Sequence, residues 1–228
     1  MYYDPAYLLF ALPGLVLGLI ATASVRSTFS RYADIPSSSG LTGAEAADRM
    51  LEAAGVGGVR IEMGGGFLTD NYNPLTRTLR LSPGVFRGRG LSSIGVACHE
   101  AGHAIQQATR FAPLTLRTAL VPVTNVASTL SYFVVLLGFL WSPRLILWGA
   151  LLFGVAVLFS LMTLPVEWDA SRRAGRLMES TGIVDGGESR EATSVLRAAF
   201  LTYVAGLVSA VFTFLYYLMR AGAFRRRD

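Results

Sequence analysis

Four long stretches of the sequence contain no charged residue and no histidine, and they limit what the chain can fold into. They run from Pro5 to Val25, from Thr118 to Pro143, from Leu145 to Val166 and from Ala198 to Met219. Each exceeds the roughly 20 apolar residues that cross the hydrocarbon core of a bilayer as a helix. Only 15% of the 228 residues are charged, well below the roughly 25% of soluble domains. We therefore predict a mainly α-helical membrane protein with about four transmembrane helices.

Arginine supplies every basic residue and is distributed unevenly between the two sides of the predicted spans. Residues 24–117 and 167–197 share one side, because two crossings separate them, and they carry fifteen of the 20 arginines. Basic loops remain in the cytoplasm, so we expect this side to be cytoplasmic, although residues 225–227 add three arginines to the other side. Anionic lipid surfaces, rather than nucleic acid, then explain the net charge of +5. The leader of the first span lacks a basic residue, which favours an uncleaved anchor over a signal peptide.

The predicted segments are a transmembrane anchor (1–25), a polar domain (26–117), a transmembrane hairpin (118–166), a helical segment (167–197) and a fourth transmembrane helix with a basic tail (198–228). The polar domain is long enough to have a fold of its own. Thr42 and Glu45 match a capping box, at the start of a helix that ends at Gly55. Residues 59–63 and 78–81 alternate in polarity like strands. We therefore expect a small α+β domain.

The only two histidines of the chain, His99 and His103, lie in the apolar sequence VACHEAGHAI. We predict that residues 93–109 form one helix, with its amino cap at Ser92 and Ser93. Residues four apart share one face of a helix, so both imidazoles can bind one metal ion. Glu100 projects about 100° away, and a carboxylate buried between imidazoles is costly unless it is compensated. The HExxH pattern is typical of zinc hydrolases, so we predict His99 and His103 as zinc ligands and Glu100 as the catalytic general base.

The third zinc ligand must be a residue other than histidine. A catalytic zinc usually has three protein ligands and one open position, and Cys98 lies about 100° from the face of His99, as expected for a small apolar filler. Glu167 and Asp169 follow the third apolar stretch on the same side of the membrane. About 200° of helix separates them, so only one can face the metal. We predict Glu167 as the ligand of one Zn²⁺ per chain, with Asp169 as the alternative.

Several stretches together resemble one protein family. HEAGHAIQ, LTDNYNPLTRTLRLS, the opening MYYDPAYLL and VEWDASRRA are similar to the YugP-like neutral zinc metallopeptidases, bacterial multi-pass membrane proteins, and the likeness extends to about residue 220. The resemblance implies a zincin-like domain in the bacterial plasma (inner) membrane, with His99, His103 and Glu167 as zinc ligands and Glu100 as base. In the related HtpX-type peptidases an aspartate follows the ligand glutamate by four residues. This chain has Ser171 there, so the role of that aspartate does not carry over.

We accordingly expect a membrane-embedded zinc metallopeptidase that hydrolyses peptide bonds of a protein or peptide substrate. Two alternatives remain: a zinc hydrolase of a non-protein amide or lipid-linked substrate, and a membrane scaffold with a structural metal site, which would not need Glu100. Candidates for stabilising the oxyanion are Tyr72, Tyr203, Arg172 and Arg173.

Two further expectations concern the polar domain. Asp70 is either a hydrogen-bond partner of a ligand histidine or a turn residue. Zinc peptidases commonly hold a peptide as an added strand, and we expect the segment Thr78–Leu81, just upstream of the histidines, to be the available edge.

Overall fold

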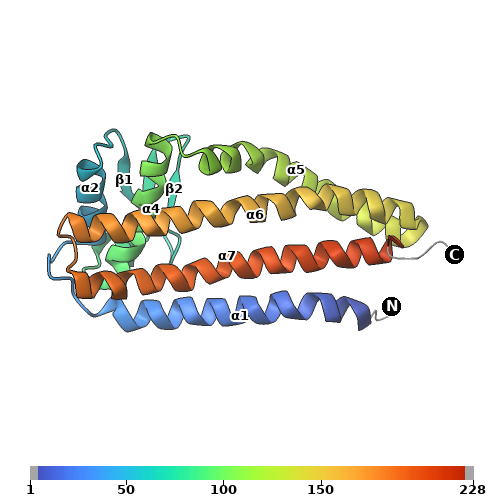
Figure 1. Cartoon of the computed structure of the whole chain (residues 1–228), viewed down its shortest axis with the longest axis horizontal. Coiled ribbons are helices and arrows are strands. Elements are labelled where there is room, and N and C mark those ends of the chain that lie inside the picture. The colour runs from blue at the N-terminus through green and yellow to red at the C-terminus, as the bar shows by residue number, and fades with distance from the viewer. Residues whose placement is uncertain (1–4, 224–228) are drawn as a thin grey trace. The chain divides into compact units, whose positions relative to one another are not determined.

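The structure is a computed structural model that describes residues 5–223 (Figure 1). Its elements in chain order are α1 (Pro5–Ala33), α2 (Gly43–Ala53), β1 (Arg60–Met63), β2 (Asn71–Asn73), β3 (Thr78–Leu81), α3 (Pro83–Arg87), α4 (Leu91–Ala108), α5 (Ala112–Trp141), α6 (Pro143–Ser180) and α7 (Gly186–Arg220). The first residues of the predicted leader and the arginines at 225–227 lie outside the described residues.

Within residues 5–223, four helices are long and apolar enough to cross a membrane, namely α1, α5, α6 and α7. The predicted class, a mainly α-helical membrane protein with a small α+β part, is therefore confirmed. Each helix extends beyond its apolar stretch. In α6 the apolar residues end at Val166, but the helix continues to Ser180, so Glu167 follows the span without an intervening loop.

The chain divides into two compact units, which are described separately. Among the described residues, unit 1 consists of 5–21, 115–165 and 201–223, and unit 2 consists of 22–114 and 166–200. Helices α1, α5, α6 and α7 each contribute one part to both units, although α5 contributes only its first three residues to unit 2. Each unit combines segments that are distant in sequence, whereas each of the five predicted segments is one continuous stretch of sequence. The boundaries of the predicted segments therefore stay a prediction.

Unit 1 holds the apolar parts of the long helices. Small residues allow close helix packing, as is common in membranes: the Ser131 hydroxyl donates to the Gly149 carbonyl at 2.8 Å. A Cβ added to Gly149 would lie only 3.0 Å from the backbone nitrogen of Val135. Large apolar side chains such as Leu9 and Leu140 are exposed on this unit, as expected for groups that face lipid.

Unit 2 contains a three-stranded sheet in the order β1-β3-β2, in which β1 runs parallel to β3 and β2 runs antiparallel. The expected alternation is present in β3, where Leu79 and Leu81 are buried and Arg80 is exposed. The expectation that Thr78–Leu81 forms an edge is wrong, because β3 is the central strand. Alternation reports which face is buried, but it does not report how many neighbours a strand has.

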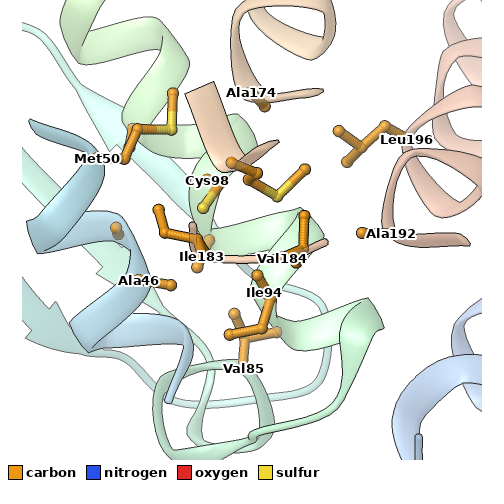
Figure 2. Packing of buried hydrophobic residues seen from close by; sticks show 14 of the residues in the cluster. Ala46, Met50, Val85, Ile94, Cys98, Ala174, Ile183, Val184, Ala192 and Leu196 are labelled. Atoms are coloured by element: carbon orange, nitrogen blue, oxygen red, sulfur yellow. The ribbon is translucent and has the colours of Figure 1, made fainter. Parts of the chain in front are cut away.

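The apolar core of unit 2 surrounds α4 (Figure 2). It includes Met50 of α2, Cys98 of α4 and Met178 of α6, all fully buried. The capping box of α2 is confirmed, since the Glu45 amide donates to the Thr42 hydroxyl oxygen at 3.3 Å and the Thr42 amide to the Glu45 carboxylate at 2.8 Å. Gly55, just beyond the helix, has a φ of +67°, which suits glycine at this position.

The start of α4 differs from the predicted one. The helix begins at Leu91 after Gly90, so the predicted cap at Ser92 and Ser93 is wrong. Both serines lie inside the helix and are buried. The Ser92 hydroxyl donates to the Phe29 carbonyl at 2.7 Å, and the Ser93 hydroxyl donates to the Gly84 carbonyl at 3.2 Å. These hydroxyls tie α4 to α1 and α3 instead of capping it.

Candidate metal centre

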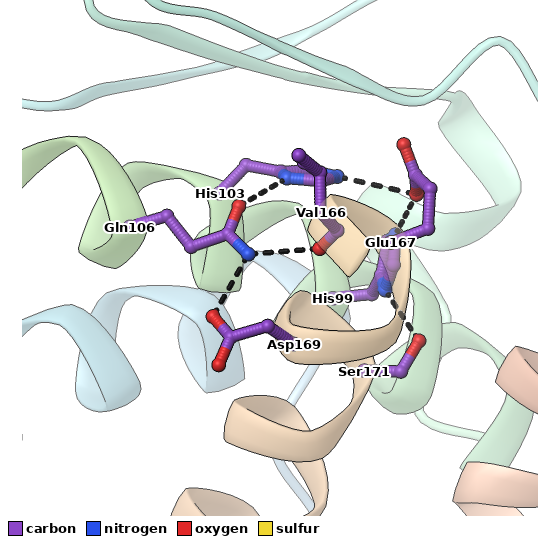
Figure 3. Close-up of polar contacts among 7 residues, drawn as sticks. All are labelled: His99, His103, Gln106, Val166, Glu167, Asp169 and Ser171. Atoms are coloured by element: carbon purple, nitrogen blue, oxygen red, sulfur yellow. Dashed lines mark hydrogen bonds and ion pairs between the residues drawn. The ribbon is translucent and has the colours of Figure 1, made fainter. Parts of the chain in front are cut away.

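Two helices of unit 2 bring the predicted ligands together (Figure 3). His99 and His103 lie one turn apart on α4, with ring centroids 4.9 Å apart. Glu167 reaches them from α6. Its Oε2 lies 3.2 Å from Nε2 of His99 and 3.5 Å from Nε2 of His103. The Glu167 side chain is only 2% exposed, so this carboxylate is directed at the two imidazoles inside the protein.

The spacing of the three side chains fits a zinc ion. Two imidazoles and a glutamate form a donor set found at catalytic zinc sites, with bonds of about 2.0–2.1 Å. Tetrahedral bonds of that length separate the ligand atoms by about 3.3–3.4 Å, and the two carboxylate-to-imidazole distances of 3.2 and 3.5 Å bracket this value. Among the described residues, these three form a group whose possible ligand atoms all lie within 4.8 Å of one another.

Gly102 explains how α4 and α6 approach closely enough for these contacts. A Cβ added to Gly102 would lie 2.8 Å from the carbonyl oxygen of Ala170 and 3.3 Å from its Cα. Ala170 follows Glu167 by three residues and therefore lies about one turn further along α6. The missing side chain at Gly102 thus sets the distance between the histidine-bearing helix and the glutamate-bearing helix.

The outer nitrogen of each imidazole also has a partner (Figure 3). The Nδ1 atom of His99 lies 3.1 Å from the Ser171 hydroxyl, and the Nδ1 atom of His103 lies 2.9 Å from Oε1 of Gln106. The Gln106 amide nitrogen donates to a carboxylate oxygen of Asp169 at 2.9 Å. The carboxylate of Asp169 is therefore directed at Gln106, while that of Glu167 is directed at the histidines.

Burial and neighbouring charges shift the pKa values of two groups near the histidines. Burial raises the pKa of the Glu100 carboxyl above its ordinary value, although His103 and His99 oppose the shift. Burial by itself would lower the pKa of His103, but the hydrogen bond and charge of Glu167 outweigh it and raise that pKa.

Cys98, in contrast, lies in surroundings that do not suit a metal ligand. Its side chain is fully buried among apolar residues, and burial raises the pKa of its thiol. Since zinc binds the thiolate, these surroundings agree with the expected role of Cys98 as an apolar filler.

Asp70 and Tyr72, the two other candidates in the polar domain, form hydrogen bonds with residues other than the histidines. The Asp70 carboxylate accepts hydrogen bonds from the amide and the hydroxyl of Ser82, at 2.7 and 3.1 Å. The Tyr72 hydroxyl donates to the side chain of Gln107 on α4.

The remaining oxyanion candidates lie on the long helices. Arg173 pairs with Asp169 at 2.5 Å, and Arg172 is exposed. Tyr203 belongs to unit 1, whereas the histidines belong to unit 2.

Sequence reasoning did not identify Gln106 and assigned no role to Ser171. Both positions carry a signal that becomes readable once the helices are known. Gln106 follows His103 by three residues and is a fully buried amide in an apolar helix, and Ser171 follows Glu167 by four. Residues three or four apart share a helix face, so each lies on the face of a predicted ligand.

Two comparisons with known proteins found sequences similar to this chain. The profile of a family described as "Putative neutral zinc metallopeptidase" matches residues 7–222. The "Putative membrane protease YugP" of Bacillus subtilis (strain 168) is 41% identical over 214 residues, which cover 93% of this chain and 95% of that protein. No solved structure gives a significant match. The resemblance found in the sequence motifs is therefore confirmed.

Proposed function

We propose that this chain, which belongs to the neutral zinc metallopeptidase family, is a membrane-embedded peptidase that holds one zinc ion with His99, His103 and Glu167. The observation that carries the proposal is the convergence of these three side chains at distances of 3.2 and 3.5 Å, with Glu100 next to His99 on the same helix. A purely structural metal site would not require a carboxylate at that position.

Glu100 is the proposed general base. Zinc, when bound, acts as a Lewis acid toward a carbonyl oxygen and makes a nearby water more acidic. The Glu100 carboxylate takes a proton from that water while the water oxygen bonds to the carbonyl carbon of the peptide. Glu100 then passes the proton to the nitrogen that leaves as an amine when the C–N bond breaks. The partly buried setting, which raises the pKa of this carboxyl, makes Glu100 a stronger base than an exposed glutamate.

An extended peptide is the substrate form that the sheet supports best. With β3 in the centre, β2 is an outer strand, and Tyr72 of β2 contacts Gln107 of α4. Gln107 lies seven residues, or two helical turns, after Glu100 and therefore on the same face of α4. We infer that a substrate chain pairs with β2 as an added strand, beside the helix face that carries the base.

The proposed location is the bacterial inner membrane, with the polar domain in the cytoplasm. Four apolar helices support the membrane location. The side is inferred from the arginines, fifteen of which fall in residues 24–117 and 167–197, because basic segments remain cytoplasmic.

The direct test compares Glu100→Gln with the parent and with Glu52→Gln, a control at an exposed glutamate of α2. The purified full chain in detergent would be assayed against unfolded membrane and soluble proteins, and its zinc content would be measured. General-base catalysis contributes about 10²–10⁴-fold, so Glu100→Gln should lose at least about 100-fold in activity and keep its zinc. Equal turnover by parent and Glu100→Gln would reject the proposed mechanism. A parent that cleaves only non-protein amides would instead favour a different substrate class.

A further inference from the structure

We propose that Gln106 is a positioning residue that fixes the ring proton of His103 on Nδ1, and that Asp169 and Arg173 hold Gln106 in the orientation this requires. The inference rests on the proposed zinc site, since it explains why Nε2 of His103 is the nitrogen available to the metal. It assigns roles to three residues outside the group of predicted metal ligands.

The first step is the orientation of the Gln106 side-chain amide, which is fully buried. One end of this amide contacts the carbonyl oxygen of Val166 at 2.8 Å and a carboxylate oxygen of Asp169 at 2.9 Å. A carbonyl and a carboxylate can only accept hydrogen bonds, so this end must be the NH₂ group. Its two hydrogens then satisfy both acceptors, and Oε1 must face His103.

The second step is the tautomer of His103. The amide oxygen Oε1 is an acceptor only, and it lies 2.9 Å from Nδ1 of His103. The hydrogen bond therefore requires a proton on Nδ1. Nε2, which lies 3.5 Å from Glu167, is then the nitrogen that offers its lone pair to a metal ion. A hydrogen bond to the outer nitrogen of a ligand histidine also increases the basicity of that ligand.

The third step is what holds Asp169 in place. Its carboxylate accepts from Nε of Arg173 at 2.5 Å, one turn further along α6. The guanidinium of Arg173 in turn lies over the ring of Phe111, 5.6 Å from its centroid. Arg173 therefore holds the Asp169 carboxylate in the position from which it accepts the Gln106 hydrogen bond. A chain of hydrogen bonds thus runs from Arg173 through Asp169 and Gln106 to His103.

The other histidine lacks this constraint. Nδ1 of His99 faces the hydroxyl of Ser171 at 3.1 Å, and a hydroxyl can donate as well as accept. Ser171 is therefore compatible with either tautomer of His99, whereas Gln106 permits only one tautomer of His103. The two ligands of α4 are consequently unequal, and this difference can be measured.

The test uses three variants of the full chain in detergent. Gln106→Met removes the acceptor and both donors while keeping a side chain of similar length. The double variant Gln106→Glu with Asp169→Asn exchanges amide and carboxylate. An oxygen still faces His103 and the two positions can still hydrogen-bond to each other, but the Val166 carbonyl loses its donor. Ser171→Ala is the matched control at the other histidine.

The main measurement is ¹H–¹⁵N correlation NMR of the imidazole N–H groups in protein labelled with ¹⁵N-histidine. Spectra are recorded without metal and with zinc. The chain has two histidines, so at most two Nδ1–H signals are present. We expect the Nδ1–H signal of His103 to disappear in Gln106→Met, to persist in Ser171→Ala, and to return in the double variant. Zinc affinity, measured by competition with a chelator, should fall by about 10–100-fold in Gln106→Met and recover in part in the double variant.

The outcomes are separable. A folded Gln106→Met protein that keeps the His103 signal, or binds zinc as tightly as the parent, would overturn the assignment. If Gln106→Met does not fold, the double variant decides, since a lost signal there rejects the role of the oxygen and a retained signal supports it. A parent that binds no zinc would overturn the proposed function, while the metal-free spectra would still establish or reject the hydrogen bond from His103 to Gln106.

Discussion

Replacing Gly102 with alanine should damage the metal centre more than the fold. The added Cβ would lie 2.8 Å from the Ala170 carbonyl oxygen and 3.3 Å from its Cα. Both are backbone atoms of α6, so neither can move away without moving the helix. Carbon contacts are favourable at about 3.5–4.0 Å, and α4 and α6 must therefore separate by roughly half an ångström.

Two opposing terms set the change in stability. Alanine is better than glycine in a helix by about 0.8–1.0 kcal/mol, whereas overpacking a close contact costs about 1–3 kcal/mol. The free energy of unfolding should therefore fall by about 0–2 kcal/mol. Metal sites tolerate about 0.2 Å in their ligand distances, so the same displacement should weaken zinc binding by about tenfold or more, as when groups that support a ligand are altered.

Gly95→Ala is the matched control, because its Cβ would lie 2.7 Å from the Ala192 carbonyl oxygen of α7. It introduces similar strain on the same helix, but against a helix segment that carries no ligand. Thermal unfolding and zinc competition would be measured for both variants and the parent. Gly102→Ala alone should lose zinc affinity. Equal losses in the two variants, or none in Gly102→Ala, would refute the idea that this contact sets the ligand spacing.

Three further predictions follow from the site and its surroundings. Removal of zinc with a chelator should abolish hydrolysis and leave the helical circular dichroism intact, because the apolar core of unit 2 is built from side chains other than the three predicted ligands. Activity should return with zinc, and unfolding on chelation would contradict this prediction. The Cys98 thiol, fully buried and with a raised pKa, should resist thiol reagents in the folded protein and react in denaturant; rapid labelling of the native protein would show that the core is open. Because Cys98 should not react in the folded protein, a thiol introduced by Glu52→Cys can report on the orientation of the polar domain. It should be labelled in inverted membrane vesicles and not in intact cells, and the reverse pattern would place the polar domain outside.

The parts of this protein that are predictable from sequence are those encoded by short-range patterns. An apolar stretch of sufficient length, a capping box at Thr42 and Glu45, and two histidines one turn apart each carry their meaning within a few residues. The prediction of Glu167 also needed the membrane topology, because a carboxylate just after the third span lies on the same side of the membrane as the histidines. The structure places it 3.2 Å from His99.

The features that could not be predicted depend on contacts between segments distant in the chain. β3 is central because β1 pairs with it in parallel, and nothing in residues 78–81 indicates a second neighbour. Ser92 was expected to cap a helix, but its hydroxyl bonds to the Phe29 carbonyl, 63 residues away. The Gln106 amide is oriented by Val166 and Asp169 of α6, which accept its hydrogens. Such partners are set by how α4 packs on α1 and α6.

The most direct measurement of the central claim is the zinc content of the purified parent compared with Glu167→Ala and Asp169→Ala. If His99, His103 and Glu167 together hold the metal, the parent should contain one zinc per chain, Glu167→Ala should lose most of it, and Asp169→Ala should retain a more weakly bound ion. A Glu167→Ala protein that binds zinc as tightly as the parent would contradict the account.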